Sequence, residues 1–260
     1  MRRGVIIADL HAGHVVGLTH PDFNPRFSPG SPFYELMRER TKYWNWYAET
    51  IASLQPIDFL FVNGDAIDGK GEASGGTELL TTDRNEQVNM AVAAIEECKA
   101  KNIWMAYGTG YHSGREEDWE VKIAEKVGAI KIGGEDYIDV NGLIFSCKHH
   151  LGRSESPMGR FTALARDRVW NVLWNEFSEY PRADVIVRAH VHYHSYCGGY
   201  GWLGVTCPSL MGYGSKYGTR RMSGSVDFGL LEFNVESKEK FSWQAHILKS
   251  NSQKSMLLTI

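Results

Sequence analysis

Side chains that could bind a metal ion follow five apolar segments of this 260-residue chain, each at the point where the segment gives way to a loop. They are Asp9 and His11, Asp65 and Asp68, Thr109 and His112, His149 and His150, and His190 and His192. Carboxylates crowded together repel one another, and a divalent cation removes that conflict. Mixed oxygen and nitrogen ligands suit manganese, iron, zinc or nickel better than calcium or magnesium. The pattern therefore predicts a metal site, provided that the fold brings the segment ends together.

Taken one at a time, these motifs have simpler structural explanations. Asp9 could cap a turn, and the stretch GDAIDG at 64–69 is also typical of a turn. His190 and His192 could be two ordinary strand histidines, one buried and one exposed. The order of the motifs, each after an apolar run, favours the site over these explanations.

The segments that must position these residues predict an α/β architecture. Short runs rich in Val, Ile and Phe are typical of buried strands, and they lie at 4–11, 56–65, 102–110, 142–150 and 183–192. Helical periodicity predicts helices between them, over 32–54, 85–102, 116–128 and 160–180. Because ligand crevices of open α/β sheets lie beyond the carboxyl ends of the strands, we expect the five ends to meet.

Two further expectations concern packing. In the helix over 160–180, the spacing predicts that Leu164, Val169, Leu173 and Phe177 face inward. After residue 190 glycine becomes frequent, and two alternating segments near 228–237 and 240–248 predict antiparallel strands of a second sheet built from the C-terminal third. Without a linker or a repeat, the chain is expected to form one domain over 1–260.

Composition narrows the class of protein. The net charge of −3, from 28 basic and 31 acidic residues, excludes a strongly basic nucleic-acid coat, although a local basic groove is compatible with it. The four cysteines form no CxxC pair, which fits free thiols in a reducing compartment. No signal peptide and no run of 18 apolar residues is present. We expect a cytoplasmic protein with no membrane partner; its oligomeric state is left open.

As an ordered set, the motifs resemble those of the calcineurin-like metallophosphoesterase superfamily over residues 5–192. The family pattern is DxH, GDxxD, GNH[DE], a lone His and GHxH. The resemblance implies a four-layer α/β/β/α sandwich of two mixed sheets flanked by helices, with two metals at the strand ends. It also implies hydrolysis of a phosphoester with water activated by the binuclear centre, with manganese as the foremost metal and iron, zinc or nickel as alternatives.

Carried over residue by residue, the resemblance implies that Asp9, His11, Asp65 and His192 hold the first metal. Asp65 would bridge to a second metal held by His190 and the lone His. Asp68 would act in catalysis by orienting a ligand. Strand alternation continues the apolar face of Phe145 and Cys147 into His149, which favours His149 as the lone His and leaves His150 for substrate contact.

The third motif departs from the family pattern. Thr109 stands where an Asn ligand is usual, and His112 comes two residues late. Either the second metal has one protein ligand fewer, or His112 has become a ligand; otherwise His112 is the candidate general acid. This variant loop, together with DLHAGHVVGLT at 9–19, is similar to phage- or prophage-encoded members, which implies the host cytoplasm as its location.

The substrate is less closely defined. We favour a phosphodiester, in nucleic acid or a nucleotide-like compound, with Thr109, His14, His150 and Arg153 as substrate contacts. Basic side chains that could clamp phosphate are Arg153, Arg160, Lys216, Arg220 and Arg221. The alternatives are a phosphomonoesterase, acting on a nucleotide or phosphoprotein, and an inactive protein-binding scaffold of the same fold. A mononuclear hydrolase would bind one metal per chain.

Overall fold

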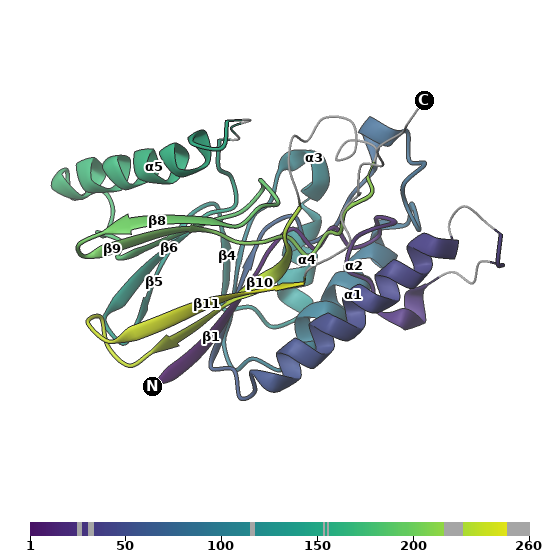
Figure 1. Ribbon diagram of the computed structural model, residues 1–260, viewed down its shortest axis with the longest axis horizontal. Helices are drawn as coiled ribbons and strands as arrows, with labels where there is room; N and C mark the ends of the chain where they lie inside the picture. The colour runs from purple at the N-terminus through teal and green to yellow at the C-terminus, as the bar shows by residue number, and fades with distance from the viewer. Residues whose placement is uncertain are drawn as a thin grey trace, which may run out of the picture.

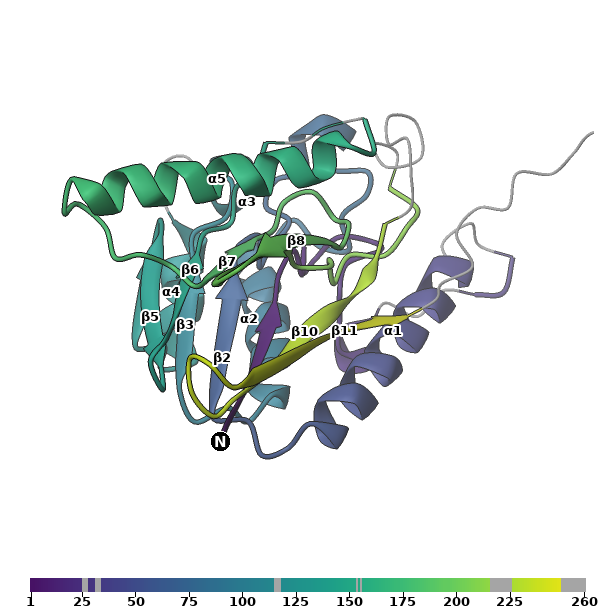
Figure 2. The ribbon, with the colours of Figure 1, turned by 60° about the vertical axis from the view of Figure 1, so that its left-hand side comes forward.

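The computed structural model describes residues 1–24, 28–30, 34–114, 118–152, 154, 156–215 and 226–248. Two mixed sheets pack face to face, and helices cover both outer faces, so the predicted α/β/β/α sandwich is confirmed (Figures 1 and 2). Among the described residues, no helix combines the length and the apolar composition that a membrane crossing needs.

The first sheet has six strands in the order β11-β10-β1-β2-β3-β4. Its parallel part consists of β1 (Arg2–Ile7), β2 (Phe59–Asn63), β3 (Ile103–Ala106) and β4 (Lys131–Gly133). The hairpin of β10 (Phe228–Val235) and β11 (Phe241–Leu248) joins it antiparallel beside β1.

The predicted C-terminal hairpin therefore exists, but its placement in the second sheet was wrong. The first half of β10 is apolar on both faces: Leu230 packs under the helices, whereas Leu231 and Phe233 pack between the sheets. A strand that is apolar on both faces suits a position covered on both sides, and β10 finds one next to β1.

The second sheet has five strands in the order β5-β6-β7-β9-β8. They are β5 (Asp136–Val140), β6 (Leu143–Cys147), β7 (Val185–Arg188), β8 (Ser195–Gly199) and β9 (Trp202–Thr206). β6, β7 and β9 run parallel, and β5 and β8 are antiparallel edges. The inter-sheet core contains Phe61, Phe145 and Phe233, which pack edge to face.

All four predicted helices are present with somewhat shorter bounds: α1 (Tyr34–Ser53), α2 (Arg84–Glu97), α4 (Trp119–Lys126) and α5 (Gly159–Glu176). A one-turn helix, α3 (Gly110–Ser113), and two 3-10 turns, Pro21–Phe23 and Glu72–Ser74, lie in loops. Asp83 and Asp118 cap α2 and α4, each accepting a backbone N–H two residues on.

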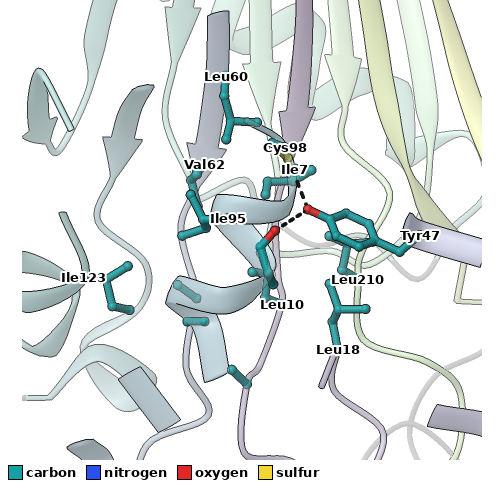
Figure 3. Close-up of a cluster of buried hydrophobic side chains, with 14 of the residues drawn as sticks. Ile7, Leu10, Leu18, Tyr47, Leu60, Val62, Ile95, Cys98, Ile123 and Leu210 are labelled. Atoms are coloured by element: carbon teal, nitrogen blue, oxygen red, sulfur yellow. Dashed lines mark hydrogen bonds between the residues drawn. The ribbon is translucent and has the colours of Figure 1, made fainter. Parts of the chain in front are cut away.

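A dense core joins α1 and α2 to the first sheet. Tyr47 of α1 is fully buried, and its hydroxyl donates to the Ala94 carbonyl at 2.7 Å and contacts Cys98 Sγ at 3.2 Å (Figure 3). Ile51 and Ile95 pack in the same cluster. This core fixes β1 and β2, whose ends carry the acidic and histidine residues.

The inward face predicted for α5 was wrong in three of its four residues. Leu164 is buried, but Val169, Leu173 and Phe177 are 59%, 43% and 69% exposed. The inner face instead carries Arg168 and Asn171, because the backbone of 181–183 needs hydrogen-bond partners there. Arg168 donates to the Ala183 carbonyl, and the Asn171 amide binds the Pro181 carbonyl and the Ala183 N–H.

Candidate metal centre

The strand ends of both sheets meet at one edge of the sandwich. Asp9 follows β1, Asp65 follows β2, His149 follows β6 and His190 follows β7. Three groups of side-chain atoms, each within 4.8 Å of one another, could hold a metal ion. They are Asp9 with His11 and His192, His11 with Asp65 and His112, and Asp65 with His149 and His190.

The backbone is unusual at these positions. Asp9, His11, Asp65, His190 and His192 have φ between 43° and 73°. Only three other non-glycine residues in the described part of the chain have positive φ. Such conformations cost free energy and cluster at functional sites, where the surrounding structure holds them. Here they occur at five of the residues whose side chains form the three groups.

The first group brings together two imidazoles and a carboxylate. His192 Nε2 lies 3.2 Å from His11 Nε2 and 3.3 Å from Asp9 Oδ1. Asp9 is fully buried, yet its Oδ1 has no hydrogen-bond partner. A buried, unpaired carboxylate oxygen facing two imidazole nitrogens fits a cation better than it fits a polar turn.

Asp68 orients His11. The Nδ1 atom of His11 lies 3.1 Å from Asp68 Oδ1 and donates to it, because a carboxylate only accepts. Nε2 then carries the lone pair and faces His192 and Asp9. A histidine held by a carboxylate through its other nitrogen is the usual arrangement at a metal.

The third group is built around Asp65 and His149. Oδ2 of Asp65 lies 3.0 Å from His149 Nε2, although the two atoms lack hydrogen-bond geometry and Nε2 is unpaired and buried. The His149 Nδ1–H donates to the Asn63 carbonyl at 2.7 Å, so Nε2 is again the nitrogen that faces the carboxylates. The backbone N–H of His190 donates to Asp9 Oδ2 at 3.2 Å and ties the two groups together.

Thr109 and His112 contribute differently to the site: Thr109 holds a carboxylate, and His112 presents an imidazole nitrogen. Thr109 donates to Asp65 Oδ1 through its backbone N–H at 2.7 Å and its hydroxyl at 3.1 Å, so it positions that carboxylate. The His112 Nδ1–H donates to the Asp68 carbonyl at 2.9 Å, and its ring packs edge-on against His11 at 4.5 Å. His112 therefore presents Nε2 beside His11 and Asp65, as one of the three groups requires.

The buried charges shift one another's protonation. Burial opposes a charge on His149, but the adjacent Asp65 carboxylate outweighs it and raises the pKa of His149 to about 10. Burial first, and His149 second, lower the pKa of His190 to about 4. Burial also opposes ionisation of Asp65, yet His149 and the neighbouring imidazoles lower its pKa well below the usual range. A cation bound between these groups would favour the neutral imidazole of His149 as its ligand.

Two supporting residues escaped the sequence analysis. Glu120 of α4 is fully buried and accepts the N–H groups of Ala66 and Gly108, which neighbour Asp65 and Thr109. Asn63 supplies the carbonyl that fixes His149. The only available signal for Glu120 was a charged residue on the apolar face of its helix, which a single sequence does not distinguish from a helix-end acid.

Two of the expected substrate contacts lie beside the three groups but differ in exposure. His14 is 5% exposed, its Nδ1 accepts the Val16 N–H, and burial lowers its pKa to about 4. His150 is exposed, with its ring 4.9 Å from that of His190.

Most of the basic residues that were expected to bind phosphate lie outside the described part of the chain. Arg153, Lys216, Arg220 and Arg221 lie outside the described residues. Arg160 stacks its guanidinium over the Tyr193 ring at 4.1 Å.

No protein-family model and no curated protein matches the sequence. Among solved structures, the chain is similar to Vps29 from Entamoeba histolytica complexed with zinc, at 12% identity and a TM-score of 0.48, over 96% of this chain and 94% of that one. It is also similar to an archaeal phosphodiesterase, at 11% identity and a TM-score of 0.47, over 95% and 99% of the two chains. Vps29 from Chaetomium thermophilum gives 11% identity and a TM-score of 0.47, over 95% and 97%.

Proposed function

We propose that this protein is a metal-dependent phosphoesterase with two divalent cations, and that its substrate is a phosphodiester. The observation that carries the proposal is the meeting of two Asp–His groups at one sheet edge, each with a buried and unpaired ligand atom: Asp9 Oδ1 in one and His149 Nε2 in the other. Asp9, His11 and His192 would hold one cation, His149 and His190 the other, and Asp65 both.

Cations at these positions would supply Lewis-acid stabilisation of the phosphoryl oxygens and a water acidic enough to act as nucleophile at neutral pH. The chain's own residues prepare the site for this. Asp68 and the Asn63 carbonyl fix the tautomers of His11 and His149, so that both present Nε2. Thr109 holds the Asp65 carboxylate in place with two hydrogen bonds.

His112 is the proposed proton donor to the leaving oxygen. Its Nδ1–H is held by the Asp68 carbonyl, so a proton on Nε2 is the one available for transfer. The alternative, that His112 is a ligand in place of the usual Asn, is supported by its grouping with His11 and Asp65. His112→Gln distinguishes the two: loss of a donor spares substrates with good leaving groups and leaves metal content unchanged, whereas loss of a ligand lowers metal content.

The experiment that tests the proposal pairs metal analysis with turnover. Protein purified without chelator is analysed for metal per chain, and hydrolysis of bis-p-nitrophenyl phosphate and p-nitrophenyl phosphate is followed after addition of Mn²⁺. We expect two metals and faster diester hydrolysis, and Asp65→Asn should lose both metal and activity. Monoester turnover alone would replace the diester assignment with phosphomonoesterase, and a metal-free, inactive wild type would favour the scaffold.

A further inference from the structure

Helix α5 has its apolar side turned to solvent. It lies on the outside of the second sheet, with no described helix or strand beyond it (Figures 1 and 2). The outer face of α5 comprises Phe161, Val169, Trp170, Leu173, Trp174, Phe177 and Tyr180 at the helix end, which are 42–69% exposed. Its inner face holds the buried polar residues Arg168 and Asn171 together with the apolar Ala163 and Leu164. An ordinary surface helix keeps most of its large apolar side chains on the inner face, whereas α5 exposes most of them.

The outer face of α5 is large enough for a stable interface. A fully exposed aromatic side chain has a surface of about 200 Å². At exposed fractions of 42–69%, the seven side chains together offer roughly 700 Å² of apolar surface. The largest patch on a typical monomer is about 300–600 Å², and a standard interface takes about 800 Å² from each partner. The face therefore has the size of one half of a protein–protein interface.

The spacing on this face indicates a helix as the partner. Arg166, Trp170, Leu173 and Phe177, the last of which is the C-cap residue of α5, follow one another at intervals of four, three and four residues. That alternation is the seam by which two helices pack along their length. Trp170 and Trp174 stack on each other at 6.2 Å, which makes the centre of the seam rigid.

We propose that the outer face of α5 binds the same face of a second copy of this chain, with the two helices antiparallel about a two-fold axis near position 171. This register places Arg166 opposite Glu176, Val169 opposite Leu173, and the small Ala165 opposite the large Phe177. Arg166 and Glu176 are both exposed, and neither has an ion-pair partner within the described part of the chain. A parallel pairing would instead set Arg166 against Arg166.

The charges at the two ends of the seam provide the test. Arg166 and Glu176 lie ten residues apart, about 15 Å along one helix, so they cannot pair within a chain. Sedimentation velocity over a concentration series is run on the full chain, on Arg166→Glu, on Glu176→Arg and on the double exchange. Lys42→Glu on the exposed side of α1 is the matched control, and thermal unfolding checks the fold of every variant.

We expect the wild type to sediment at twice the 29.3-kDa chain mass. Each single exchange should raise the dimer dissociation constant about tenfold or more, because the two-fold axis creates two like-charge contacts. The double exchange should restore it, and Lys42→Glu and chelator should have no effect. A monomeric wild type, a larger assembly, or a double variant as weak as the singles would each overturn the proposal. None of these outcomes depends on whether the protein hydrolyses a phosphoester.

Discussion

Replacing Asp68 with alanine removes the acceptor that orients His11. Asp68 is 4% exposed, and its Oδ1 accepts the His11 Nδ1–H at 3.1 Å. Without it, the Nδ1–H of His11 would be buried without a partner, and the imidazole would favour the other tautomer or turn away. Either change withdraws the Nε2 lone pair from His192 and Asp9.

The size of the effect follows from the bond that is lost. Removing a residue that orients a metal ligand lowers metal affinity about 10- to 100-fold, which corresponds to about 1.4–2.8 kcal/mol. Asp68→Asn keeps an acceptor oxygen but exchanges a charge-assisted bond for a neutral one. Because neutral bonds contribute about half as much, we expect Asp68→Asn to lose roughly the square root of the alanine effect, about 3- to 10-fold.

The assay is competition of each variant with a chromogenic chelator for Mn²⁺ and Zn²⁺, followed by activity at saturating metal. Thermal unfolding of the metal-free proteins separates loss of affinity from loss of fold. If Asp68→Ala binds metal as tightly as the wild type, then Asp68 does not orient a ligand. If Asp68→Asn is weaker than Asp68→Ala, the hydrogen bond is not the cause.

Three further changes test other parts of the structure. Gly108→Ala would place a Cβ 2.2 Å from Asp65 Oδ1, so metal binding should be lost, and unchanged metal content would contradict the close packing. Tyr47→Phe should lower the unfolding free energy by about 1 kcal/mol in urea titration while metal affinity stays constant; a shift in affinity would show that the core and the site are coupled. Burial opposes the charge on Glu232, but the hydrogen bond from His246 outweighs burial and lowers the pKa of Glu232 below 4.5. Glu232→Gln should therefore be less stable than the wild type at about pH 7, and this difference in stability should vanish as the pH falls through the lowered pKa. A difference in stability that persists in acid would refute the ion pair.

Local sequence patterns predicted most of the elements. The apolar runs before Asp9 and Asp65 are short and β-branched or aromatic, and both are strands because strand formation depends on local side-chain shape and burial. Helices α2 and α4 also form where the local sequence favours a helix, and each begins after an aspartate, Asp83 or Asp118, that caps its first turn.

The outward face of α5 was not predictable in this way. Periodicity located its apolar stripe, but not which side of the helix meets the sheet. That side was decided by the unpaired backbone groups of 181–183, which required Arg168 and Asn171. The same limit applied to β10, because Leu230 on one face and Leu231 and Phe233 on the other are compatible with either sheet until the neighbouring strands are known.

The sequence by itself determined which chemistry is available: carboxylates and imidazoles placed directly after apolar strands, in a fixed order. Only the tertiary structure decided that Asp9 and His192, 183 positions apart along the chain, lie 3.3 Å from each other. It also decided that Nε2 of His149, which strand alternation favoured over the exposed His150, lies 3.0 Å from Asp65 Oδ2. The physical reason is that residue type and strand periodicity are local properties, whereas these distances depend on the packing of two sheets and on left-handed turns that the surrounding structure holds in place.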